Sequence, residues 1–231
     1  MTFTDYQSAF SIPRLDTYLN ACSGDQNRTI RAYKANLKMS QSFLGVLNVF
    51  EVTLRNETDA HYRKRFGNNW ILSESSPNGF LRTKGCERSL KNVETTIKEK
   101  FTDKNKPFNQ NEAICHLGFG FGSHLFASKE YNAAGNTLLQ IFSKRPKGVR
   151  QGQIFSNLQD INHIRNRIAH HEPFCFTKLK LPNQPRILSN SYAMYNYRLI
   201  ADLMKWMNYD MVTLLSDTHN FLADANNLSN I

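Results

Sequence analysis

The residues best suited to chemistry lie close together, near the end of an expected helix. Arg165 and Asn166 are followed by the histidine pair His170 and His171. A histidine, whose unperturbed pKa is about 6.5, can take a proton from a ribose 2′-hydroxyl or give one to a departing 5′-oxygen. An arginine can hold the phosphate oxygens as negative charge develops on them, and an asparagine can orient the phosphate or the imidazole. These residue types could cleave RNA without a metal, leaving a 2′,3′-cyclic phosphate and a 5′-hydroxyl.

The spacing limits how one helix can present these residues. We expect a helix over residues 151–171, stopped by Pro173, with one apolar stripe made of Ile154, Leu158, Ile161, Ile164 and Ile168. Arg165 lies about 40° from the centre of this stripe and roughly 140° around the axis from His170. Either the helix ends or distorts before His170, or two chains combine as an antiparallel helix pair around a two-fold axis. On spacing alone, a simpler interpretation is a helix end at which His170 and His171 cap the dipole.

The chain carries an excess of positive charge. Its 29 Lys+Arg and 19 Asp+Glu among 231 residues give a net charge of +10 and a pI near 9.5. This balance favours a polyanionic partner, although solubility alone would also account for it. The candidates for RNA contacts are all basic: Arg63, Lys64, Arg65, Lys144, Arg145, Lys147, Arg150 and Arg167. For the clusters at 63–65 and 144–150, an ordinary solvated surface is the alternative.

Little in the sequence points to a metal, a cofactor or a membrane. The four cysteines, Cys22, Cys86, Cys115 and Cys175, are far apart and form no Cys-x-x-Cys pair. No apolar run approaches the roughly 20 residues that span a bilayer, and no secretory signal is visible. We therefore expect no metal, no cofactor, no membrane partner, and a cytoplasmic location with free thiols.

The rest of the periodicity is helical. We expect an all-α chain with a single domain over residues 1–231, including an N-terminal helical extension of about 1–24 and a C-terminal tail of about 219–231 that frays or docks. The expected helices cover about 13–22, 25–66 (continuous or broken near Ser40), 81–101, 111–127, 132–142, 151–171 and 191–216. Residues 68–80 and 174–189 are expected to form loops, and 144–150 a basic turn.

Glu51 is placed near an apolar stripe, where a carboxylate needs a cation. It lies about 40° from Leu47 around the helix axis. Arg55, one turn further on, is one available partner. Arg165 is the other, and a pair between Glu51 and Arg165 would orient the guanidinium toward a phosphate.

The run from Gly118 to Ser123 is rich in glycine, which suggests a phosphate-binding loop. However, it lacks the G-x-G-x-x-G spacing, a preceding strand and a Walker lysine. We interpret it as a tight turn between helices with packed aromatic side chains.

The Arg–His segment resembles the signature of the Abi-like family (the AbiD/AbiF group), a branch of the HEPN superfamily. That signature has an arginine, a polar residue that is usually asparagine, and a histidine after four to six residues in all. Arg165, Asn166 and His170 fill these places. Residues 47–56, with a Glu-x-x-x-Arg element, resemble the early helix of the family, and residues 117–120 resemble its Phe-Gly turn. The resemblance spans roughly residues 25–215.

The resemblance implies a HEPN-type helical bundle with additional helices, usually a homodimer. It implies a metal-independent endoribonuclease that acts as a toxin or an abortive-infection effector in phage defence. Arg165, Asn166 and His170 would be the active residues, and His171 is a second candidate because the motif spacing varies. Besides the RNA substrate, an antitoxin or a structured non-coding RNA is an implied partner. The alternative function is an RNA-binding regulator or ribonucleoprotein subunit that cleaves nothing.

Overall fold

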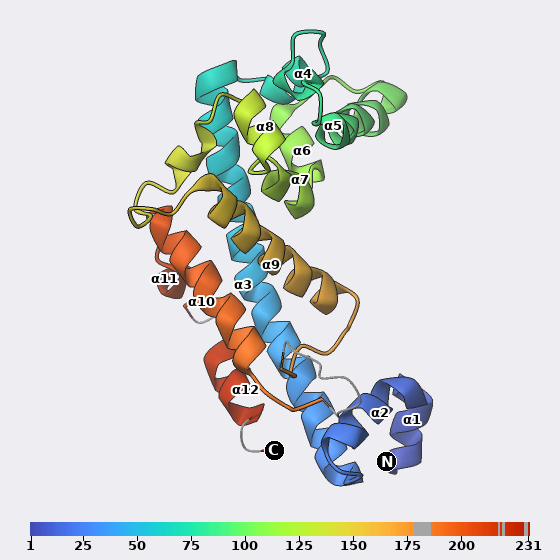
Figure 1. The fold of residues 1–231 in the computed structure, drawn as a ribbon. Helices are drawn as coiled ribbons and strands as arrows, with labels where there is room; N and C mark the ends of the chain where they lie inside the picture. Colours follow the sequence, from blue (N-terminus) through green and yellow to red (C-terminus); the bar gives the residue numbers. More distant parts are fainter. Residues whose placement is uncertain (178–185, 217, 219, 229–230) are drawn as a thin grey trace. The chain divides into compact units, whose positions relative to one another are not determined.

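The regular secondary structure of the described residues is helical, which confirms the prediction of an all-α fold. A computed structural model describes residues 1–177, 186–216, 218, 220–228 and 231 (Figure 1). Among these residues there is no strand, and the one isolated bridge, which is antiparallel, joins Phe176 and Leu188. The α-helices are α1 (Phe3–Phe10), α2 (Ile12–Ala21), α3 (Gln26–Phe66), α4 (Trp70–Glu74), α5 (Glu87–Lys100), α6 (Gln110–His116), α7 (Phe119–His124), α8 (Ser128–Ala133), α9 (Gln151–Ala169), α10 (Ser191–Trp206), α11 (Met211–Leu214) and α12 (Phe221–Asn227). Short 3-10 turns cover Phe80–Arg82, Thr102–Lys104 and Leu138–Ile141.

The chain divides into two compact units. Unit 1 contains residues 1–48, 163–201 and 212–231, and unit 2 contains residues 49–162 and 202–211. Helices α3, α9 and α10 each contribute residues to both units. The single domain expected over residues 1–231 stays a prediction.

Aromatic side chains pack the interior of unit 1. Phe43 of α3 contacts Phe174 and Phe221, with ring centroids 5.8 and 5.0 Å apart. Phe221, in α12, also stacks on Tyr197 of α10 at 5.0 Å. The C-terminal segment is tied down further because the carbonyl of Ile231 accepts a hydrogen bond from Arg28 Nε at 2.7 Å. The tail was expected either to fray or to dock, and its described residues dock.

One carboxylate joins three helices of unit 2. Asp59 Oδ1 accepts hydrogen bonds from Trp70 Nε1 and from Gln110 Nε2, both at 2.8 Å. Asp59 Oδ2 accepts from Arg63 Nε at 2.5 Å, one turn along α3. The other end of the Arg63 guanidinium donates to Asn111 Oδ1 at 2.7 Å. Asp59 thus satisfies the indole N–H of a tryptophan that is fully buried.

The long helix is continuous, which is one of the two alternatives expected for it, whereas another expected helix is divided. Helix α3 runs through Ser40 without a break, and the Ser40 hydroxyl donates to the carbonyl of Asn36 at 2.8 Å. The helix expected over residues 111–127 is instead divided into α6 and α7, because the chain is extended at Leu117 and Gly118. Within the glycine-rich run, only Gly118 lies in the connection, as the N-cap of α7. Residues 119–123 belong to α7, so the interpretation of the whole run as a turn was wrong.

Other boundaries also differ from the expectation. Helices α1 and α4 were not expected, and both are short, so sequence periodicity carries little signal for them. The helix expected from residue 81 begins only at Glu87, and the one expected over 132–142 is replaced by α8 and a 3-10 turn. The last long helix ends at Trp206, followed by Asn208 with a left-handed φ of 70°.

Glu74 is a buried carboxylate in the last turn of α4. The residue is 2% exposed, and its Oε2 accepts a hydrogen bond from the backbone N–H of Leu81 at 2.9 Å. The connection passes so close to α4 that a Cβ on Gly79 would lie 2.6 Å from the Glu74 carbonyl oxygen. Burial raises the pKa of Glu74 to about 7, because the charged form loses its hydration.

We expect the free energy of unfolding to fall as the pH rises between about 4.5 and 7. Over this range the folded state holds a proton on Glu74 that the unfolded chain has released, so raising the pH favours unfolding. The Glu74→Gln variant retains an acceptor for Leu81 and should lose this contribution, about 3 kcal/mol. Urea denaturation followed by circular dichroism on both sides of the range measures it. Glu99→Gln, on an exposed carboxylate of α5, is the control and should keep the wild-type pH dependence. Unchanged pH dependence in Glu74→Gln would contradict the assignment.

Candidate functional site

Helix α9 ends immediately before the histidine pair. The carbonyl of Asn166 accepts the last regular helical hydrogen bond, from the backbone N–H of His170 at 2.9 Å. The chain then turns at His171, whose φ of 55° is left-handed. The N–H of His171 donates to the Ile168 carbonyl at 3.0 Å, and that of Glu172 to the Arg167 carbonyl at 2.7 Å. This pair of bonds is a Schellman motif, which satisfies carbonyls that the helix end leaves open.

The first of the two geometric alternatives drawn from the sequence describes this helix, because α9 ends at Ala169, before His170. The second alternative, an antiparallel helix pair from two chains, stays a prediction. The position of the histidine pair at a helix C-terminus also fits the capping interpretation. A helix end and a catalytic turn are compatible, because capping uses the backbone and leaves both rings available.

The side chains of the α9 stripe and of the Arg–His motif differ in their exposure to solvent. The isoleucines and Leu158 of the α9 stripe are buried. Arg165 and Asn166 are half-buried, whereas His170 and His171 are exposed. Arg165 Nη1 donates to Asn166 Oδ1 over a long 3.4 Å. The end of α9 and the turn after it thus carry one half-buried guanidinium and two imidazoles that are exposed to solvent.

The side chains of two arginines stabilise the turn by donating to backbone carbonyls. Arg14 of α2 donates from Nη1 to the carbonyl of His171 at 2.8 Å. Arg167 donates from Nη2 to the carbonyl of Pro173, and its Nε lies 3.8 Å from the Glu172 carboxylate. Arg167, predicted to contact RNA, therefore makes internal contacts around the turn. Sequence reasoning missed Arg14, and no local signal could have found it, because it contacts a residue 157 positions away.

The segment after the turn returns directly to the core of unit 1. The backbone N–H of Phe174 donates to Oδ1 of the buried Asn36 at 3.1 Å. Cys175 follows, fully buried, and burial raises the pKa of its thiol to about 12. A thiol of that kind is not a nucleophile at neutral pH. Helix α9 precedes the histidine pair and the anchored Phe174 follows it, and between them both histidines are exposed.

Glu51, the predicted orienting residue, is half-buried on α3. It belongs to the part of α3 in unit 2, whereas Arg165 belongs to unit 1. Its role as a partner of Arg165 or Arg55 stays a prediction.

The basic residues predicted to contact RNA fall into two groups. Five are exposed, namely Lys64, Arg65, Lys144, Lys147 and Arg150. Arg63 and Arg145 are half-buried in unit 2 and serve the fold. Arg63 binds Asp59 and Asn111 as described above. Arg145 donates to the carbonyls of Val149, Leu139 and Phe142 at 3.1–3.2 Å, which closes the basic turn on itself.

The described part of the chain contains no cluster of side chains suited to a metal. Among those residues, no group of three or more His, Cys, Asp or Glu side chains could hold a metal ion. No described helix is long and apolar enough to cross a membrane.

The left-handed backbone of His171 predicts a specific effect of glycine. Because glycine adopts this conformation without the Cβ penalty, His171→Gly should raise the free energy of unfolding by about 0.5–1 kcal/mol. His170→Gly is the matched control: His170 lies one residue earlier, outside the left-handed region. There glycine only adds flexibility and should lower the free energy of unfolding by up to about 1 kcal/mol. Urea denaturation compares the two, and a shift of the same sign in both would contradict the role of the turn.

No protein-family model, no curated protein and no solved structure matches this chain. The resemblance to the Abi-like family therefore rests on the motif residues Arg165, Asn166 and His170 and on the segments 47–56 and 117–120. Function must be inferred from the chemistry that the turn at the end of α9 can carry out.

Proposed function

We propose that the protein is a metal-independent endoribonuclease of the HEPN type. The observation that carries the proposal is the end of α9, where an anchored turn leaves His170 and His171 exposed a few residues after the half-buried Arg165 and Asn166. A residue set of this kind needs only an RNA strand as its substrate. The excess of positive charge, +10 over the chain, supports an anionic polymer as the ligand.

In the proposed reaction, the ribose 2′-oxygen attacks the adjacent phosphorus. An imidazole of the pair, His170 first, takes the proton of the 2′-hydroxyl as the O–P bond forms. The bond from phosphorus to the 5′-oxygen breaks, and that oxygen takes up a proton, which leaves a 2′,3′-cyclic phosphate and a 5′-hydroxyl. The Arg165 guanidinium stabilises the additional charge on the phosphate oxygens, and Asn166 positions the phosphate or a ring.

The biological role we propose follows the Abi-like resemblance. The enzyme would act in the cytoplasm as an abortive-infection effector or as the toxin of a toxin–antitoxin pair, restrained by an antitoxin or a structured non-coding RNA. A homodimer, with two copies of the turn meeting across a two-fold axis, is part of the proposal. Such an arrangement would supply an acid and a base from different chains.

A non-catalytic RNA-binding protein is the second candidate, favoured by one observation. The exposed cations Lys144, Lys147 and Arg150 lie within one short turn of unit 2, which suits contacts to a phosphate backbone. Backbone contacts of this kind need neither histidine.

The catalytic assignment predicts the loss of cleavage on substitution in the turn. In the presence of EDTA, Arg165→Ala and His170→Ala should each cleave an RNA panel at least about 100-fold more slowly than wild type, because each removes acid–base or charge stabilisation. His163→Ala, on an exposed histidine of the same helix, is the matched control and should retain activity. His171→Ala identifies which ring of the pair is required. Mass spectrometry of the products checks for the cyclic phosphate.

Equal residual activity in wild type, Arg165→Ala and His170→Ala would overturn this assignment. Tight RNA binding without cleavage by any of these proteins would instead favour the non-catalytic candidate.

The separation of exposed from internal cations predicts how salt affects RNA binding. Replacing both Lys147 and Arg150 with Gln should weaken binding of single-stranded RNA. The slope of log affinity against log salt should fall by about 0.7 for each phosphate that the variant no longer neutralises. Lys84→Gln, on an exposed lysine of unit 2 outside both clusters, should leave the slope unchanged. Filter binding over a range of salt concentrations provides the measurement. A wild-type slope in the double variant would show that the basic turn does not touch RNA.

A further inference from the structure

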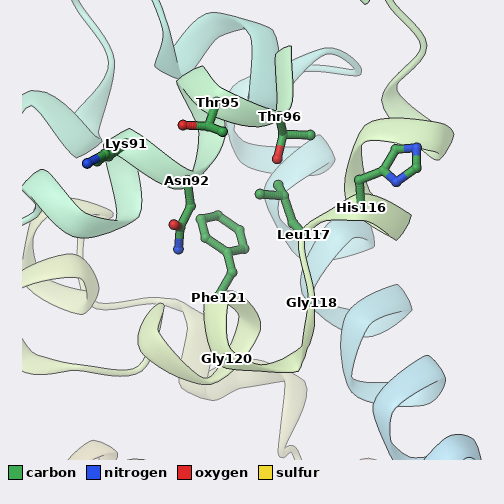
Figure 2. Close-up of a pocket in the computed structure, with 9 residues that line it drawn as sticks. All are labelled: Lys91, Asn92, Thr95, Thr96, His116, Leu117, Gly118, Gly120 and Phe121. Carbon is green, nitrogen blue, oxygen red and sulfur yellow. The ribbon is translucent and has the colours of Figure 1, made fainter. Parts of the chain in front are cut away.

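A groove of about 510 Å³ lies within unit 2, away from the residues of the α9 turn in sequence. One wall is α5, which contributes Lys91, Asn92, Thr95 and Thr96 (Figure 2). The other wall is the junction of α6 and α7, which contributes His116, Leu117, Gly118, Gly120 and Phe121. Its volume falls in the range of about 300–1,000 Å³ that is usual for small-molecule sites.

The α5 wall presents a row of polar groups that the protein itself does not use. Among the described residues, none is a hydrogen-bond partner of the side chains of Asn92, Thr95 or Thr96. On α3, by contrast, the hydroxyls of Thr29 and Thr53 donate to the carbonyl one turn back, at 2.7 and 2.8 Å. Serines and threonines inside helices commonly adopt that bond when nothing else is available.

Thr96 is the most informative member of this row. It is only 9% exposed, yet its hydroxyl has no partner in the described part of the protein, and Figure 2 shows that hydroxyl directed toward the space between the two walls. Thr96 is not among the residues with a fully buried polar atom that lacks a partner, so its hydroxyl faces solvent in the groove. A ligand in the groove would replace that solvent as its hydrogen-bond partner.

The opposite wall is kept free of side chains by two glycines. The φ angles of Gly118 and Gly120 are not left-handed, and a Cβ at either position would meet nothing within 4 Å. Neither backbone conformation nor internal packing therefore requires glycine there, although glycine costs a helix up to about 1 kcal/mol relative to alanine. What the missing side chains do provide is open space, in which a ligand can approach the backbone closely.

The remaining lining indicates the kind of ligand. Leu117 and the ring of Phe121 form an apolar floor beside the amide of Asn92 (Figure 2). Lys91 and His116 lie at opposite ends of the set, and no carboxylate is among the residues that line the groove. Glu112, one turn before His116, is held by Lys106 at 2.6 Å and lies 3.7 Å from His116. A flat apolar face, hydrogen bonds along one edge and a negative group beside a lysine are together the properties of a nucleotide.

We propose that the groove between α5 and the α6–α7 junction binds a single nucleotide, either free or as one unit of an RNA strand. The base lies over Leu117 and Phe121, its edge meets Asn92 and the two threonines, and its phosphate approaches Lys91. This inference goes beyond the proposed ribonuclease activity, because binding here requires none of the residues of the α9 turn.

The test uses the full chain carrying His170→Ala and His171→Ala, so that any RNA in the experiment stays intact. Calorimetric titration with the four nucleoside 5′-monophosphates, with inorganic phosphate, and with single-stranded RNA of about six nucleotides measures binding. Gly120→Leu fills the groove and should weaken nucleotide binding about tenfold or more. Gly122→Leu is the matched control: Gly122 lies in the same helix, α7, has equally open space, and does not line the groove. It should bind as the parent protein does.

Thr95→Val and Asn92→Leu provide a second series that does not alter the junction. Each should weaken nucleotide binding several-fold, since each removes a hydrogen-bonding group from the groove. Weakened binding of both monophosphates and RNA in Gly120→Leu would support a site open to free nucleotides. Weakened binding of RNA alone would support a site for one unit of a strand. The proposal is overturned if neither ligand binds, if phosphate binds as tightly as the nucleotides, or if Gly120→Leu and Gly122→Leu behave alike.

Discussion

The left-handed backbone at His171 is the constraint on which the candidate active site depends. If α9 continued past Ala169, the histidine pair would follow the helix around to its other side. Instead, the Schellman bonds stop the helix, and Arg14 and Asn36 fix the chain that follows the stop, at His171 and Phe174. A residue with a Cβ is uncommon in this conformation, although histidine tolerates it better than most. The turn is therefore maintained by its surroundings as well as by its own hydrogen bonds.

Much of the local structure could be predicted from periodicity. The buried stripe of α9 and the half-buried position of Arg165 follow from residue type and spacing. The glycine run was wrongly interpreted as a turn, because residues 119–123 lie in α7. Whether α9 ended before His170 could only be stated as one of two alternatives, since no glycine marks the stop. Short helices such as α1 and α4 were missed because a few residues do not establish a period.

What could not be predicted are the contacts between residues far apart in the sequence. Arg63 and Arg145 look like the other members of their clusters in the sequence, but in the structure their guanidinium groups bind a carboxylate, an amide and backbone carbonyls. Exposed Lys64, Lys147 and Arg150 carry the same charge and are free to face an anionic partner. Charge counts therefore overestimated the number of cations available to an anionic partner, and only the tertiary contacts separate structural from available cations.

The position of the two tryptophans has a practical consequence. Trp70 and Trp206 are the only tryptophans in the chain, and both belong to unit 2. Trp70 is fully buried, with its indole N–H on Asp59, so its emission should change sharply when that surrounding structure opens. Unit 1, which carries the α9 turn, contains no indole. Intrinsic fluorescence would therefore follow the loss of structure in only one of the two units, while signals from the amide backbone would follow both, so that disagreement between the two signals would reveal whether the units unfold separately.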